Sequence, residues 1–160
     1  MKMISTTTLD FLETDVPALL SQLTAETRPC WGLMTAQHVL EHLGGVLKLS
    51  ASYREVPLLL SPEQSQSIRL MALSGKFPPN FQNPAFPSTP PPLRFASFED
   101  AQSRFLDALQ EALQYLKSKP ERCTQHPLAG PFSAQDWIDF HAGHIQHHFR
   151  QFGLIPLDFP

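Results

Sequence analysis

The chain has 160 residues, of which 42% are hydrophobic and 17% are charged, and its formal net charge at pH 7 is −3. This length and composition are typical of one globular domain, here residues 1–160. The 12 basic residues are outnumbered by 15 acidic ones and form no basic cluster, which argues against a nucleic-acid partner. No run approaches the roughly 20 apolar residues of a membrane span, and residues 1–6 lack an apolar signal core. We therefore expect a cytoplasmic protein without a membrane partner.

Two amphipathic helices are predicted in the first third of the chain. The first covers about residues 9–24, where apolar side chains recur every three or four positions, at Leu12, Val16, Leu19, Leu20 and Leu23. After a break that contains Pro29 and Gly32, Thr35 can cap the second helix. Its expected inward stripe is Ala36, Val39, Leu40, Leu43, Val46 and Leu47. This second helix carries His38 and His42.

The middle of the chain is less regular. A short extra helix is predicted after Ser61, and Gly75 should end it. Seven prolines then lie between Pro78 and Pro92. Because each proline removes an amide donor and restricts the residue before it, this density excludes a regular helix or a central strand. We expect a long ordered loop or a flexible lid.

Two further helices follow the Pro-rich segment. Ser97 opens a third helix that should run through about Lys117, with a buried stripe of Phe98, Ala101, Phe105, Ala108, Leu109, Ala112 and Leu116. Ser133 opens a fourth, which should continue until Gly153. No strand is predicted. The expected fold is therefore all-α, an antiparallel four-helix bundle with a long Pro-rich connection and an extra short helix.

The fourth helix carries four histidines within eight residues, from His141 to His148. His144 and His148 are one turn apart, so they project from one face and can bind a single ion. A catalytic divalent ion usually takes three protein ligands. His42, in the middle of the second helix, is the favoured third ligand, and His38 is its rival.

Other interpretations of these residues remain open. Each histidine can instead be a buried ring that is hydrogen-bonded to oxygen atoms. His38, Glu41 and His141 are candidate proton carriers or partners of the ligand rings. The aromatic residues near the histidines can line an apolar pocket or pack in the core; they are Trp31, Trp137, Phe140 and Phe152.

The chain resembles the DinB-like (DinB/YfiT) superfamily, in particular a branch described only as a domain of unknown function. The resemblance rests on residues 31–43 (WGLMTAQHVLEHL) and 144–153 (HIQHHFRQFG), with residues 126–131 (HPLAGP) and Trp137 between them. It implies a bundle with a divalent metal held by three histidines, here His42, His144 and His148. The superfamily often has HHRGQ where this chain has HHFRQ at residues 147–151.

These observations favour a metal-dependent transferase or hydrolase that acts on a small molecule. The resemblance implies that the second substrate can be a low-molecular-weight thiol and that the protein forms a homodimer. Three imidazoles suit zinc, nickel or iron, and they do not distinguish among these metals. The alternative is a noncatalytic bundle that binds a ligand or dimerises and has a structural or vestigial metal site.

Overall fold

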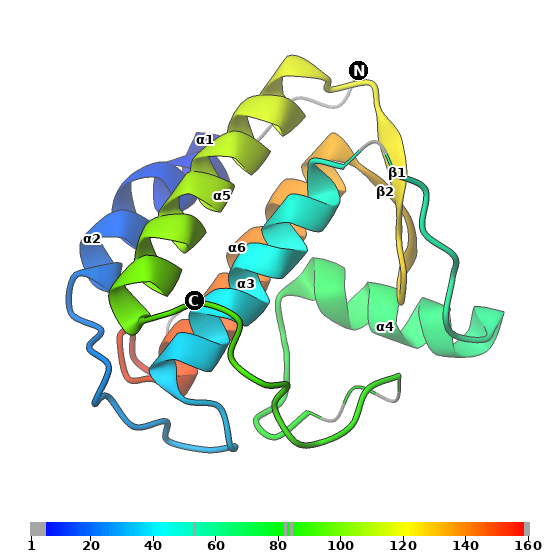
Figure 1. The fold of residues 1–160 in the computed structure, drawn as a ribbon. Coiled ribbons are helices and arrows are strands. Elements are labelled where there is room, and N and C mark those ends of the chain that lie inside the picture. The colour runs from blue at the N-terminus through cyan, green and yellow to red at the C-terminus, as the bar shows by residue number, and fades with distance from the viewer. Residues whose placement is uncertain (1–5, 53, 82, 84, 159–160) are drawn as a thin grey trace.

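The computed structural model describes residues 6–52, 54–81, 83 and 85–158. Residues 1–5, which belong to the segment predicted to lack a signal core, lie outside this description. Three long helices pack together: α3 (Ala36–Ser50), α5 (Phe98–Ser118) and α6 (Ala134–Gln151). An N-terminal helical stretch lies against them, and a fourth helix and a small hairpin lie on the other side of the molecule (Figure 1).

The expectation of an all-α, antiparallel four-helix bundle is wrong. Strands β1 (Cys123–His126) and β2 (Gly130–Ser133) form an antiparallel hairpin, in which Cys123 pairs with Ser133 and His126 pairs with Gly130. Each strand is four residues long, which is too short for a clear alternation of polar and apolar side chains. The hairpin turns the chain from the end of α5 into the start of α6 (Figure 1).

The N-terminal helix is interrupted by a wider turn. It consists of α1 (Thr6–Asp10), a π-helical turn η1 (Phe11–Asp15) and α2 (Val16–Leu20), so it begins and ends earlier than predicted. The Val16 amide donates to the carbonyl of Phe11, five residues before it. Pro17 follows directly and has no amide hydrogen for an α-helical bond. The wider turn accommodates this proline without breaking the helix.

Helices α3, α5 and α6 begin at the capping residues that the sequence predicts. The hydroxyls of Thr35, Ser97 and Ser133 each accept a hydrogen bond from the backbone amide three residues later. The seven residues of the predicted α5 stripe are all buried. On α3, Val46 is only partly buried, and the other five residues of its predicted stripe are buried. Local sequence patterns therefore predicted the starts and the buried faces of these helices correctly.

The short helix expected after Ser61 is α4 (Pro62–Ser74), and Gly75 follows it with a φ of 69°. This helix packs against α6, and Gly75, directly after its C-terminal end, lies against Gly143. A Cβ atom built on Gly143 would lie 2.7 Å from the Cα atom of Gly75. The two helices can approach this closely only because Gly143 has no side chain.

The Pro-rich connection has no regular structure in its described residues and is anchored at its end by Glu41. The buried Glu41 carboxylate accepts hydrogen bonds from the backbone amides of Arg94 and Phe95, at 2.8 Å and 3.0 Å. Burial alone would raise the pKa of this carboxyl group. Hydrogen bonds from both amides and from Gln37, with the nearby Arg94 charge, outweigh that effect and lower the pKa.

Among the helices of the described residues, none has the combination of length and apolar character that crossing a membrane requires.

The contact between Gly143 and Gly75 yields a prediction about stability. We expect Gly143→Ala to lower the free energy of unfolding by about 1–3 kcal/mol, because the new methyl group collides with backbone. Gly44, on α3, is a matched control because its added Cβ would meet its nearest neighbour, Phe105 Cα, at 3.8 Å. Gly44→Ala should leave stability unchanged or raise it by up to about 1 kcal/mol. Urea unfolding measures both, and equal losses in the two variants would contradict the argument.

Candidate metal centre

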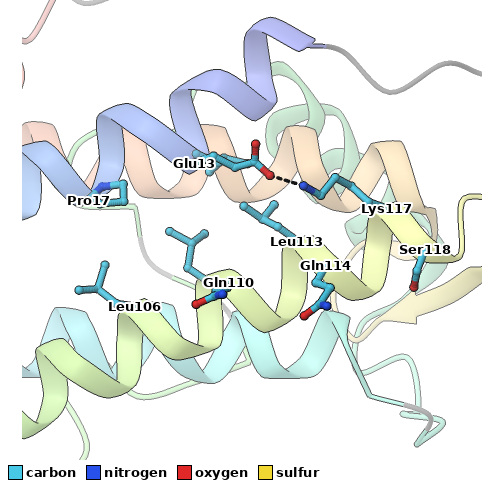
Figure 2. A pocket seen from close by; sticks show the side chains of 10 residues that line it. Glu13, Pro17, Leu106, Gln110, Leu113, Gln114, Lys117 and Ser118 are labelled. Atoms are coloured by element: carbon cyan, nitrogen blue, oxygen red, sulfur yellow. Dashed lines mark hydrogen bonds and ion pairs between the residues drawn. The ribbon is translucent and has the colours of Figure 1, made fainter.

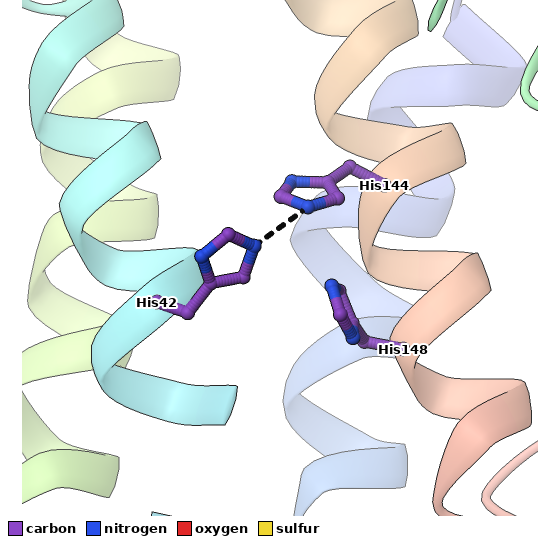
Figure 3. A group of neighbouring side chains, drawn as sticks. All are labelled: His42, His144 and His148. Atoms are coloured by element: carbon purple, nitrogen blue, oxygen red, sulfur yellow. Dashed lines mark hydrogen bonds between the residues drawn. The ribbon is translucent and has the colours of Figure 1, made fainter. Parts of the chain in front are cut away.

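The structure brings three of the predicted residues together between two facing helices. His42 extends from α3, and His144 and His148 extend from α6 toward it (Figure 3). One ring nitrogen from each histidine lies within 4.8 Å of the others. The Nε2 atoms of His42 and His144 are 2.9 Å apart. These are the three histidines predicted as ligands, and metal binding by them stays a prediction.

The separation of these nitrogens fits a single transition-metal ion. An imidazole nitrogen binds zinc at about 2.0–2.1 Å, so two ligands of a tetrahedral ion lie about 3.3–3.4 Å apart. This spacing lies between the 2.9 Å that separates the His42 and His144 nitrogens and the 4.8 Å within which all three ring nitrogens lie. Three histidines would leave one position of a tetrahedral ion for water or substrate.

Gln151 holds the ring of His148 in a defined orientation. The Gln151 amide nitrogen donates to the backbone oxygen of Trp31 at 3.0 Å, which turns its Oε1 toward His148. His148 Nδ1 lies 2.7 Å from this oxygen. Since the oxygen can only accept, Nδ1 carries the hydrogen, and Nε2 keeps the lone pair that a metal requires.

The surroundings of all three rings favour the neutral form. Burial lowers the pKa of His42 to about 4, and the neighbouring His147 adds to this effect. Burial, followed by the other histidines, places the pKa values of His144 and His148 well below the ordinary value. His42 also lines the cavities beside the group. Neutral imidazole is the form that binds metals, so the group is ready to do so at pH 7.

The structure places the other candidates outside the ligand group. His38 completes the cap of α3, with its Nδ1 atom 2.7 Å from the Thr35 hydroxyl. His141 Nε2 lies 2.8 Å from the hydroxyl oxygen of Ser50, which itself donates to Leu47. Neither histidine lines a cavity beside the group. Their assignment as proton carriers stays a prediction, and the rival ligand His38 is not part of the group.

Two adjoining cavities lie beside the group: His42 and His148 line both of them, and His144 lines one. An inner cavity of about 290 Å³ lies behind Phe77 and Phe140, and an outer cavity of about 500 Å³ extends to Trp31 and the Pro-rich segment. Both are lined by Met34, His42, Phe81, Asn83, Phe86, His147 and His148. Of the aromatic candidates, Trp31 and Phe140 line the cavities. Trp137 and Phe152 belong to the core.

Two residues of this site, Phe77 and Gln151, were not predicted in these roles from the sequence. The Phe77 ring lies 5.9 Å from His144, centroid to centroid, although no periodic pattern marks Phe77 as a site residue. Gln151 is one turn beyond His148 on α6. Its position three residues after a proposed ligand was the only feature of the sequence that could have indicated its contact with the His148 ring.

A larger cavity, of about 730 Å³, lies away from the histidines. It is bordered by the N-terminal helix and α5, and Glu13 and Lys117 form an ion pair across it (Figure 2). Its described lining contains no histidine or cysteine.

No protein-family model matches the chain, and no curated protein or solved structure matches it significantly. The resemblance to the DinB-like superfamily therefore rests on the quoted sequence motifs.

The contact between Gln151 and His148 predicts one tautomer of the histidine ring. In metal-free wild type, proton–nitrogen correlation spectra of the imidazoles should show His148 with its hydrogen on Nδ1. Gln151→Leu removes the acceptor, so the ring should populate both neutral tautomers. Gln146→Leu, on the same helix, should leave the His148 signals unchanged. A wild-type ring with its hydrogen on Nε2 would contradict the assignment.

The burial of His141 predicts a pH dependence of stability. Burial lowers the pKa of this ring to about 3, so the unfolded chain binds more protons below about pH 6.5. Stability should therefore fall as the pH drops from 6.5 toward 3. His141→Gln keeps a nitrogen that can donate to Ser50 but cannot titrate. Between pH 7 and pH 5 this variant should lose about 2 kcal/mol less stability than wild type.

Urea unfolding at the two pH values, with a chelator present, measures this difference. Identical losses in wild type and His141→Gln would show that His141 is not held neutral by the fold.

Proposed function

We propose that this protein binds one divalent metal ion through His42, His144 and His148 and acts on a small molecule as a transferase or hydrolase. The observation that carries the proposal is the convergence of three neutral imidazole nitrogens beside two cavities. Such an ion, when bound, lowers the pKa of a bound water or thiol or polarises a carbonyl group. The resemblance to the DinB-like superfamily supports the same ligand set.

The chain's own residues would serve this chemistry in distinct ways. Gln151 keeps the Nε2 lone pair of His148 directed away from the amide and available to the ion. Phe77 and Phe140 pack beside His144, with ring centroids 5.9 Å and 5.2 Å away, and limit water on that side. The outer cavity provides a route to His42 and His148 from the surface near Trp31.

The choice of a transferase that uses a low-molecular-weight thiol rests on the resemblance alone. The histidine set accommodates zinc, nickel or iron, because all three accept imidazole ligands. Metal binding therefore has to be tested before the reaction is assigned.

One observation favours the noncatalytic alternative. The direct contact between the Nε2 atoms of His42 and His144 joins α3 to α6 without an ion. One ring must donate and the other accept, so this hydrogen bond by itself can stabilise the packing of the two helices. In this alternative the histidines have a structural role, and removing them would lower stability without abolishing a reaction.

The test is calorimetric titration of tag-free, chelator-stripped protein with Zn²⁺, Ni²⁺ and Fe²⁺, the last under anaerobic conditions. Wild type should bind close to one equivalent of at least one of these ions. His42→Ala, His144→Ala and His148→Ala should each weaken that binding by about two orders of magnitude, because three ligands are the minimum for such a site. His147→Gln, next to a ligand but outside the group, should change the affinity less than about threefold.

Circular dichroism should show that each variant remains folded. Absence of stoichiometric binding in folded wild type, or equal losses in His147→Gln and the ligand variants, would overturn the metal site. Stoichiometric binding without turnover in thiol-transfer and hydrolysis screens would favour the noncatalytic alternative.

A further inference from the structure

The inner cavity is apolar and carries no charged side chain among its described lining residues. Its walls come from α3, α4, α6, the turn of the hairpin and the start of the Pro-rich segment. Apolar side chains form most of the surface, including Val46, Leu49, Ile68, Met71 and Phe77. An ionised ligand placed here would lose its hydration without gaining an opposite charge. In the metal-free protein, the cavity therefore selects against charged compounds.

His126 contributes a polar atom to this apolar lining. It sits at the end of β1, and its Nδ1 atom accepts hydrogen bonds from the backbone amides of Leu128 and Ala129, at 3.1 Å and 3.2 Å. Because both partners are donors, Nδ1 must be the unprotonated nitrogen. A neutral ring then carries its hydrogen on Nε2. The turn of the hairpin thereby fixes the tautomer of His126.

The Nε2–H group of His126 has no hydrogen-bond partner among the residues that the structure describes. The residue is only 6% exposed, yet it lines the inner cavity. Burial lowers the pKa of this ring to about 4, so it is neutral at pH 7. The Nε2 atom is not among the fully enclosed, unpartnered polar atoms of the described residues, so a ligand or a water molecule in the cavity can reach it and accept its hydrogen.

Aromatic packing holds the ring in place. The rings of Phe132, Trp137 and Phe140 surround His126, with centroid distances of 5.1 Å, 5.3 Å and 4.9 Å. Phe140 also stacks on His144 at 5.2 Å. The Phe140 ring is therefore in contact with both His126 and one member of the histidine group.

We infer that the inner cavity is a binding site for an uncharged, largely apolar compound, and that His126 orients this compound by donating its Nε2–H to a carbonyl or similar acceptor. A ligand that passes over Phe140 in this orientation would direct its other end toward His42, His144 and His148. The inference deepens the proposed function by naming the class of substrate. Its statement about the reacting end rests on that function, whereas binding in the cavity does not.

The test uses two neutral probes of similar size in metal-free protein with a chelator present. Acetanilide has a phenyl ring and a carbonyl acceptor, and ethylbenzene has the ring without the acceptor. Both should bind wild type, as followed by titration in amide proton–nitrogen spectra, with shifts at residues around the inner cavity. His126→Asn places an oxygen near the position of Nδ1 and preserves the turn, but it has no donor at the position of Nε2.

This variant should weaken acetanilide binding by at least about fivefold, because it loses one neutral hydrogen bond to the ligand and a bond of this kind contributes about that factor to the affinity. Ethylbenzene affinity should change less than about twofold. Val46→Phe, which fills the inner cavity, should abolish binding of both probes. Gln110→Trp, in the separate cavity beside α5 (Figure 2), should affect neither.

Equal effects of His126→Asn on the two probes, or no effect on either, would overturn the role of His126. Failure of both probes to bind folded wild type would overturn the cavity as a binding site. Because no metal is present, these results are independent of the metal titration. Probe binding without stoichiometric metal would keep this inference and remove the proposed function.

Discussion

The burial of uncharged imidazole rings is the constraint on which this structure depends. Histidines in the interior lose hydration, which lowers their pKa, and their ring nitrogens need hydrogen-bond partners in place of water. The described structure meets this need with a hydroxyl for His141, an amide oxygen for His148 and two backbone amides for His126. His42 and His144 pair with each other. The neutral state that stabilises the fold also leaves nitrogen lone pairs for a metal.

Polar side chains on the two central helices connect this interior to the loops that form the cavity walls. Glu41 on α3 binds the end of the Pro-rich segment through the amides of Arg94 and Phe95. Gln151 on α6 contacts both His148 and the backbone of Trp31. The loops near the histidines are thus positioned by residues that neighbour the proposed ligands in sequence. A change in the packing of α3 against α6 would move the ligand group and the outer cavity together.

Particular residues show how far sequence patterns predict the site. His144 and His148 share a face because a helix repeats every 3.6 residues, and this local rule holds in the structure. The capping hydroxyls of Thr35 and Ser133 likewise act on amides three residues away. The hairpin was not predicted, because strands as short as Cys123–His126 depend on pairing rather than on their own pattern. The π-helical turn before Pro17 was not anticipated either.

The sequence by itself determined where the long helices begin, which faces they bury and which histidines share a helix face, since these properties depend on neighbours within one or two turns. The sequence favoured His42 over His38 as the partner of His144 and His148, and the tertiary structure places it beside them. Only the tertiary structure decided that Glu41 anchors a loop and that His126 reaches the cavity. These outcomes depend on the distances and angles between elements that are remote in sequence, which are set by the packing of their side chains.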